Sequence, residues 1–220
     1  MKKFNDPILI VSAPRSGSSL LAYILNKEGI QVGITKAGDK YNVNGYFENI
    51  RIRNLMIKYL KENDKQKLGK KFQPINIRSD FKNFNRKMYR VLRQDKFDKN
   101  KNWLIKDPKL TLCWNIFNKE YPNAKWILLY RNQNDIMSSY KKTEFMDAYN
   151  TEDDWKKYLN CFYENMNSIK LECKNVFEFD IKNIFENNIN EINKLFEFIG
   201  IKNTNKYIEC VDKELFTINK

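Results

Sequence analysis

The sequence predicts an α/β fold, a parallel sheet flanked by helices, from two observations. Short apolar runs alternate along the chain with segments whose apolar residues recur at helical spacing. The first of these runs, Ile8–Val11, is uninterrupted and rich in β-branched residues, as expected of a buried strand. Because ligands of such folds bind beyond the carboxyl ends of the strands, the residues that follow each strand form the candidate site.

The first strand, Ile8–Val11, leads through the turn SAPRSGSS into a helix. Four apolar residues at helical spacing predict that helix: Leu20, Leu21, Ile24 and Leu25. This order places free backbone N–H groups and the positive end of the helix dipole at the turn, which favours an anion. Gly17 allows the backbone to come close to a ligand, and Arg15 offers a planar fork of donors to phosphate or sulfate oxygens.

The turn is not a Walker A loop, because that loop needs the pattern G-x-x-x-x-G-K-[ST]. The stretch here has one glycine and no lysine. Taken alone, the turn leaves open an ordinary strand-to-helix connection with a serine cap and no ligand.

Three further strands are predicted, at residues 103–106, 125–130 and 176–179. Lys106 and Arg131 stand at the ends of the second and third strands, as Arg15 follows the first. Parallel strands end at the same edge of a sheet, so we expect these three cations to converge on one crevice.

Further helices are predicted over residues 49–62, 81–92, 111–121, 134–142, a long segment from 151, and 189–199. Thr111 is expected to precede its helix. Thr151, followed by acidic residues, is expected to cap the long helix, and Gly200 to end the last one. A short strand is expected within residues 29–33.

Length and composition bound the kind of protein. At 220 residues the chain can bury a full core, and we expect residues 1–220 to form a single domain. No apolar run approaches the roughly 20 residues of a membrane span, and the short lead into the first strand leaves no room for a signal peptide. Four scattered cysteines without a CxxC pair and the lack of histidine predict a cytoplasmic location, reduced thiols and no metal site.

The net charge of +13 indicates an anionic partner of some kind. Nucleic acid, a membrane surface and a phosphorylated nucleotide all fit, as does a surface of solvated lysines. The aromatic residues fall on predicted core stripes rather than beside basic clusters, so we expect no nucleic-acid partner.

The turn and a second segment carry a family resemblance. SAPRSGSSLL resembles the 5′-phosphosulfate-binding loop of sulfotransferases that use 3′-phosphoadenosine 5′-phosphosulfate (PAPS). In YRNQNDIMSSY, Arg131 and Ser139 have the spacing of the pair that holds the 3′-phosphate of PAPS in that family, where a charged fork and a hydroxyl distinguish a phosphate from a bare ribose. GYFE, WLIKDPK, PNAKWILLYRN, VFEFDI and INKLFEFIG are also similar to stretches of bacterial-type sulfotransferases.

The resemblance implies a P-loop NTPase-like sulfotransferase fold and transfer of a sulfuryl group from PAPS to an acceptor hydroxyl or amine, with PAP as product and no metal. It places Lys106 near the transferring group and Phe179 near the adenine-stacking aromatic. The residues it assigns to the phosphosulfate loop are Arg15, Ser16, Gly17, Ser18 and Ser19.

Two departures from the family pattern bear on mechanism. Pro108 stands where many members carry a histidine base, and the glycine-rich C-terminal motif that grips the 3′-phosphate is missing. Without histidine the base is a carboxylate or absent; Glu48 is the first candidate, as in family members that use a glutamate, and Asp107 the second. Glu48 as a helix N-terminal acid, and Asp107 as a turn residue, stay open.

Other functions stay open at this point. A nucleotide or sugar kinase shares the strand–turn–helix start, and the net charge of +13 leaves open a non-catalytic domain that binds anions or nucleic acid. A degenerate sulfotransferase could also bind nucleotide without catalysis. The resemblance leaves the acceptor unspecified among a sugar or glycan, a lipid headgroup, a small alcohol and a peptide tyrosine, and the oligomeric state is equally open. Loops at residues 35–45, 66–78 and 143–150 are expected to shape the acceptor pocket.

Overall fold

The computed structural model describes residues 4–63, 81–143, 151–205 and 207–211. Its centre is a four-stranded sheet in the order β2-β1-β3-β4 in which every paired strand is parallel, as the sequence predicts. The strands are β1 (Ile8–Val11), β2 (Leu104–Lys106), β3 (Lys125–Tyr130) and β4 (Asn175–Asp180). Since β1 and β3 are central, the turn after β1 lies beside the residues that follow β3.

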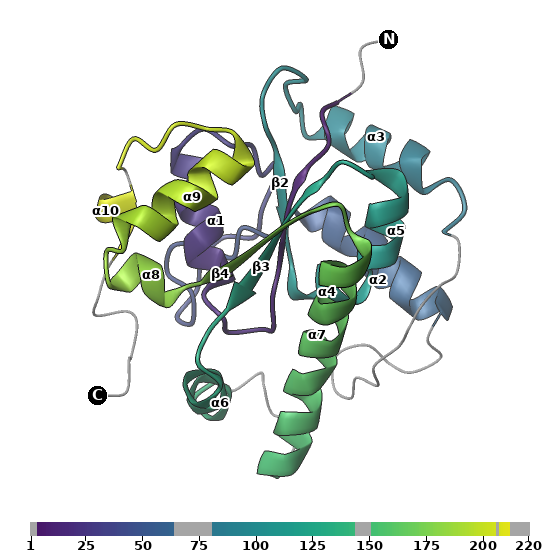
Figure 1. Cartoon of the computed structure of the whole chain (residues 1–220). Helices are drawn as coiled ribbons and strands as arrows, with labels where there is room; N and C mark the ends of the chain where they lie inside the picture. The colour runs from purple at the N-terminus through teal and green to yellow at the C-terminus, as the bar shows by residue number, and fades with distance from the viewer. Residues whose placement is uncertain (1–3, 64–80, 144–150, 206, 212–220) are drawn as a thin grey trace.

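Helices cover both faces of the sheet (Figure 1). One face carries α1 (Ser18–Lys27), α8 (Lys182–Phe185), α9 (Ile189–Ile199) and α10 (Tyr207–Cys210). The other packs against α2 (Ile50–Asn63), α3 (Phe84–Gln94), α4 (Pro108–Leu112), α5 (Trp114–Glu120), α6 (Gln133–Lys141) and α7 (Glu152–Glu172).

The central strands contribute to two cores at once. In β1, Leu9 and Val11 pack with the α2–α7 side, whereas Ile8 and Ile10 pack with the α1 side. All four side chains are buried, with at most 3 % of their surface exposed. Burial on both faces is why these strands read as unbroken apolar runs in the sequence.

Helix ends follow local capping chemistry. The Thr151 side chain accepts a hydrogen bond from the Asp154 N–H, and Gly200 ends α9 at φ +77°, so both predicted caps are confirmed. The predicted start at Thr111 is wrong, because the helix begins at Pro108 with Asp107 as its N-cap. Asp107, which the sequence left open as a turn residue, is this N-cap, and Pro108 is the first helical residue, a position that proline favours.

The short strand expected in residues 29–33 is a single parallel bridge between Gln31 and Trp103. Of the helices that the structure describes, none is long and apolar enough to cross a membrane. The predicted acceptor loop at 66–78 lies outside the described residues, as does most of the loop at 143–150.

Candidate active site

The turn between β1 and α1 is shaped by two left-handed residues. Arg15 has φ +65° and Gly17 has φ +86°, the region that favours glycine. A Cβ added to Gly17 would stand 2.8 Å from Ile181 Cγ1, just beyond β4, so close packing as well as φ requires glycine here. Gly17 is the N-cap of α1, where the alternative interpretation placed a serine. By helix geometry, the N–H groups of the first turn have no intrahelical partner.

Arg15, Arg131 and Ser139 converge on this turn, as the sequence predicts. The Arg15 Nε–H donates to Ser139 Oγ at 2.9 Å, and an Arg131 Nη1–H donates to the Arg15 carbonyl at 3.1 Å. Asp135 lies 3.7 Å from Arg131 Nε. Burial lowers the pKa of both guanidinium groups, and the positive charge of Arg15 lowers the pKa of Arg131 further. Two desolvated cations side by side favour an anionic ligand between them.

Lys106, the last residue of β2, is only 3 % exposed. Its ammonium donates to Ser19 Oγ at 3.0 Å, to the Tyr46 carbonyl at 3.0 Å and to Glu48 Oε1 at 3.2 Å. An ammonium has three donors, so these contacts tie the end of β2 to the start of α1 and to the segment before α2.

Glu48 is 7 % exposed and is held on both carboxylate oxygens. While Oε1 accepts from Lys106, Oε2 accepts from Arg53 Nη1 at 2.9 Å. The α2 cap is Asn49, whose side chain accepts from the N–H groups of Arg51 and Ile52. Glu48 therefore lies one residue before the cap, and its carboxylate contacts Lys106 at the end of β2 and Arg53 on α2.

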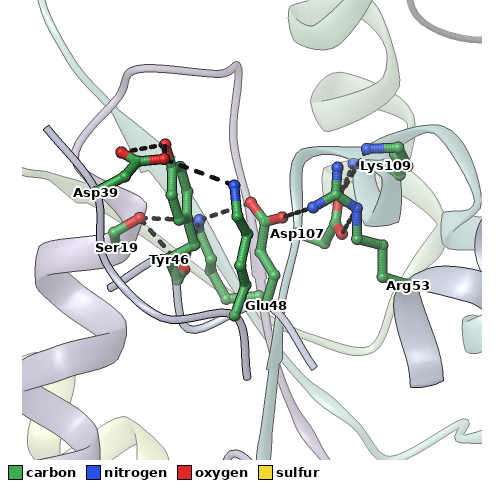
Figure 2. Close-up of polar contacts among 9 residues, drawn as sticks. Ser19, Asp39, Tyr46, Glu48, Arg53, Asp107 and Lys109 are labelled. Carbon is green, nitrogen blue, oxygen red and sulfur yellow. Dashed lines mark hydrogen bonds and ion pairs between the residues drawn. The ribbon is translucent and has the colours of Figure 1, made fainter. Parts of the chain in front are cut away.

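Asp107 is buried and faces the α2 side of the site. Burial raises the pKa of its carboxyl, while Lys109 opposes that rise. Oδ1 accepts from the Lys109 N–H at 2.8 Å, and Oδ2 lies 3.9 Å from Arg53 Nε. Figure 2 shows Arg53 between Glu48 and Asp107. Oδ1 serves as the cap of α4, which fits the structural role that the sequence left open, whereas the buried Oδ2 has no hydrogen-bond partner and only the charge of Arg53 nearby.

Tyr46 is a site residue that the sequence does not indicate. Its hydroxyl donates to the Asp39 carboxylate, with 2.9 Å to each oxygen (Figure 2). Burial and the Asp39 carboxylate raise the pKa of Tyr46 to about 12. The Lys36 ammonium lies 4.7 Å from the centre of the Tyr46 ring and 3.6 Å from Asp39. These contacts hold the two ends of the loop that precedes Glu48 together, Lys36 and Asp39 at one end and Tyr46 at the other.

A cavity of about 260 Å³ joins these groups. Of the predicted site residues, eight line it: Arg15, Gly17, Ser18, Ser19, Glu48, Lys106, Arg131 and Ser139. Residues 40–44 line it as well, which agrees with an acceptor loop at 35–45.

Two predicted residues lie elsewhere. The Ser16 side chain is buried, with 1 % of the residue exposed, and does not line the cavity. Phe179 is also 1 % exposed and packs in the core on the α1 side. Its ring has no free face for an adenine, so the stacking assignment is wrong. β4 carries apolar residues on both faces, and the sequence does not distinguish a buried ring at its end from an exposed one.

The described residues contain no group of three or more His, Cys, Asp or Glu side chains placed to hold a metal ion. Four cysteines, Cys113, Cys161, Cys173 and Cys210, are buried free thiols.

A family model described as "Sulfotransferase family" matches residues 7–205. The chain belongs to the sulfotransferase family. The match includes β1, the turn that follows it, the ends of all four strands and every residue that lines the cavity. Among curated protein sequences, none matches this sulfotransferase.

Solved structures agree on the fold. The sulfotransferase domain from the curacin biosynthetic pathway aligns with a TM-score of 0.59 at 11 % identity, over 98 % of this chain and 81 % of that one. A sulfotransferase of Mycobacterium tuberculosis H37Rv aligns with a TM-score of 0.56 at 13 % identity, over 95 % and 71 %. The sulfotransferase domain of the Synechococcus PCC 7002 olefin synthase aligns with a TM-score of 0.55 at 13 % identity, over 99 % and 82 %.

Proposed function

We propose that this enzyme transfers a sulfuryl group from PAPS to a hydroxyl, or an amine, of an acceptor such as a carbohydrate or lipid, and releases PAP. The observation that carries the proposal is the convergence of Arg15, Lys106 and Arg131, from three different strand ends, on the first turn of α1. A doubly phosphorylated nucleotide has anionic groups to match cations at both ends of such a cavity.

The proposed donor position follows from these contacts. The 5′-phosphosulfate lies at the first turn of α1, where Ser18 and Ser19 offer N–H and hydroxyl donors and Arg15 a guanidinium. The 3′-phosphate lies against Arg131 and Ser139. Because Arg15 already contacts Ser139 at 2.9 Å, the two phosphate positions share one side chain. Ser16 contributes through its backbone alone.

The proposed reaction is an in-line displacement. The acceptor oxygen or nitrogen forms a bond to sulfur, the bond from sulfur to the 5′-phosphate oxygen breaks, and Glu48 accepts the acceptor's proton. Lys106, 3.2 Å from Glu48, stabilises the charge that develops on the departing oxygen, together with Arg15. A positioned general base contributes about 10²–10⁴-fold to the rate. No residue in this scheme calls on a metal ion.

Several wider assignments belong to the same proposal. We assign one domain to residues 1–220, a cytoplasmic location, a small-molecule or glycan acceptor and no nucleic-acid partner. Residues 40–44, which line the same cavity as Glu48, contribute to the acceptor pocket.

Calorimetric titration with PAP, ADP and ATP tests the donor assignment. We expect tight binding of PAP and much weaker binding of ATP. Arg131→Ala removes a charge-assisted contact worth about 1.5–3 kcal/mol, so PAP affinity falls about 10- to 150-fold. Arg90→Ala, an exposed arginine on α3, is the matched control and leaves affinity unchanged. Binding of ATP as tight as that of PAP contradicts the proposal and favours a kinase.

A further inference from the structure

Arg53 is the one cation beside Glu48 that lies outside the cavity lining among the described residues. It belongs to α2, and its side chain is 36 % exposed, while the carboxylates that it contacts are 9 % exposed in Glu48 and 1 % exposed in Asp107. Its guanidinium thus reaches inward from the surface to two buried acids.

The two contacts differ in kind. Nη1 donates a hydrogen bond of 2.9 Å to Glu48 Oε2, whereas Nε faces Asp107 Oδ2 at 3.9 Å. Asp107 is buried and caps α4 through the Lys109 N–H, while its Oδ2 has no hydrogen-bond partner. The Arg53 guanidinium therefore hydrogen-bonds Glu48 and makes only a longer charge contact with Asp107 (Figure 2).

Fixing Oε2 decides which oxygen of Glu48 faces the reaction. Arg53 holds Oε2 on the α2 side, and Oε1 is left toward Lys106 and the cavity. Without Arg53, the carboxylate keeps a partner on one oxygen only and can rotate about its side-chain torsions. A base must lie within hydrogen-bond reach of the proton that it accepts, and a displacement of about 1 Å can cost about 10²-fold in rate.

We propose that Arg53 is a positioning residue that orients Glu48 as the base, with buried Asp107 as a second carboxylate near its charge. This inference rests on the proposed function, in which Glu48 accepts the proton. It assigns to α2 a part in the reaction that compensates for Pro108, at the position where a histidine base is lacking. Lys106 then acts on the leaving group and Arg53 acts through the base.

Hydrolysis of PAPS tests this role without any knowledge of the acceptor. Water is the nucleophile: its oxygen bonds to sulfur, the bond to the 5′-phosphate breaks, and the proton passes to Glu48 and then to solvent. The measurement is single-turnover release of labelled sulfate from [³⁵S]PAPS with enzyme in excess, for Arg53→Met, Glu48→Gln and the double variant. Calorimetric binding of PAP is measured for each.

Arg51→Met is the matched control. Arg51 is also on α2, is 40 % exposed on its side chain, and pairs with Asp95, whose side chain is fully buried. Its loss therefore leaves a buried carboxylate without its arginine, as the loss of Arg53 does. Asp95 keeps hydrogen bonds from the Asn49 side chain and the Ile34 N–H, and Arg51 pairs with Asp95 instead of Glu48. Any general cost of breaking such a pair appears in both variants.

We expect Arg53→Met to lower the hydrolysis rate at least about 10-fold with PAP affinity unchanged, and Arg51→Met to leave both unchanged. In the Glu48→Gln background, Arg53→Met should cost nothing more, because residues that act through one another are not additive. Arg53→Lys keeps a cation beside Glu48 and recovers part of the rate.

Equal rates for Arg53→Met and Arg51→Met, or additive losses with Glu48→Gln, would refute the role of Arg53 while leaving the donor assignment intact. Wild-type hydrolysis no faster than that of free PAPS, with PAP still bound, would remove Glu48 as a base toward water and the Arg53 role with it. Failure of the wild type to bind PAP would overturn the proposed function itself.

Discussion

The buried pair of Lys106 and Glu48 makes a stability prediction that can be worked from its geometry. Lys106 Nζ lies 3.2 Å from Glu48 Oε1, and the two side chains are 4 % and 9 % exposed. Removing one partner of a buried ion pair typically costs about 3–5 kcal/mol, because the other charge stays buried without compensation. Glu48 keeps Arg53 as a second partner at 2.9 Å, so we expect Lys106→Met to cost about 3 kcal/mol, at the lower end of that range.

Neutralising the stranded carboxylate should recover most of this loss. We expect Lys106→Met with Glu48→Gln to be only about 1 kcal/mol less stable than the wild type. Lys58→Met is the control, since Lys58 pairs with Glu62 on the surface of α2 at 60 % exposure and should cost less than about 0.5 kcal/mol. The assay is urea unfolding followed by circular dichroism. Equal losses for the single and double variants would refute the reasoning, because the cost would then come from lost packing and not from the buried charge.

Three further predictions follow from single contacts. Gly17→Ala adds a Cβ 2.8 Å from Ile181 at φ +86° and should lower the free energy of unfolding in urea by about 2–4 kcal/mol. Gly29→Ala is the control and should cost about 1 kcal/mol, because φ there is +93° and nothing lies within 4 Å of the added Cβ. Equal costs for the two variants would show that Ile181 gives way freely. Ser139→Ala should weaken PAP binding in calorimetry about 5- to 10-fold, less than Arg131→Ala, because a neutral hydroxyl is lost and not a charge; an unchanged affinity would remove Ser139 from the phosphate site. Burial raises the pKa of Asp107 above its ordinary value of about 3.8, so the carboxyl of the unfolded chain ionises first as the pH rises above that value. The wild type should therefore lose stability relative to Asp107→Asn when unfolding is measured from pH 3 to 8. A gain in the stability of the wild type relative to Asp107→Asn over this range would contradict the raised pKa.

The parts of the fold and site that depend on order along the chain were predictable from the sequence. β1 and β3 are buried on both faces and read as apolar runs, and a cation directly after a parallel strand must lie at the carboxyl edge. This is why Arg15, Lys106 and Arg131 could be brought together before the structure was known.

What the sequence did not reveal depends on packing between distant segments. The role of Arg53 requires that α2 lie beside the end of β2, and no local pattern states that. Gly17 was attributed to the approach of a ligand, yet its added Cβ would meet Ile181, which follows a different strand. The assignments of Phe179 and Thr111 are wrong for a related reason. A ring near the end of a strand and a threonine near Asp-Pro each fit two local structures, and only the tertiary contacts decide between them.

A crystal structure of the enzyme with PAP bound tests the donor site most directly. We expect the 5′-phosphate within hydrogen-bond distance of the Ser18 and Ser19 N–H groups, and the 3′-phosphate against Arg131 and Ser139. We also expect Glu48 Oε1 to face the side of the cavity formed by residues 40–44. A PAP molecule bound with its phosphates exchanged, or bound away from the first turn of α1, would contradict the assignment of this site to sulfuryl transfer from PAPS.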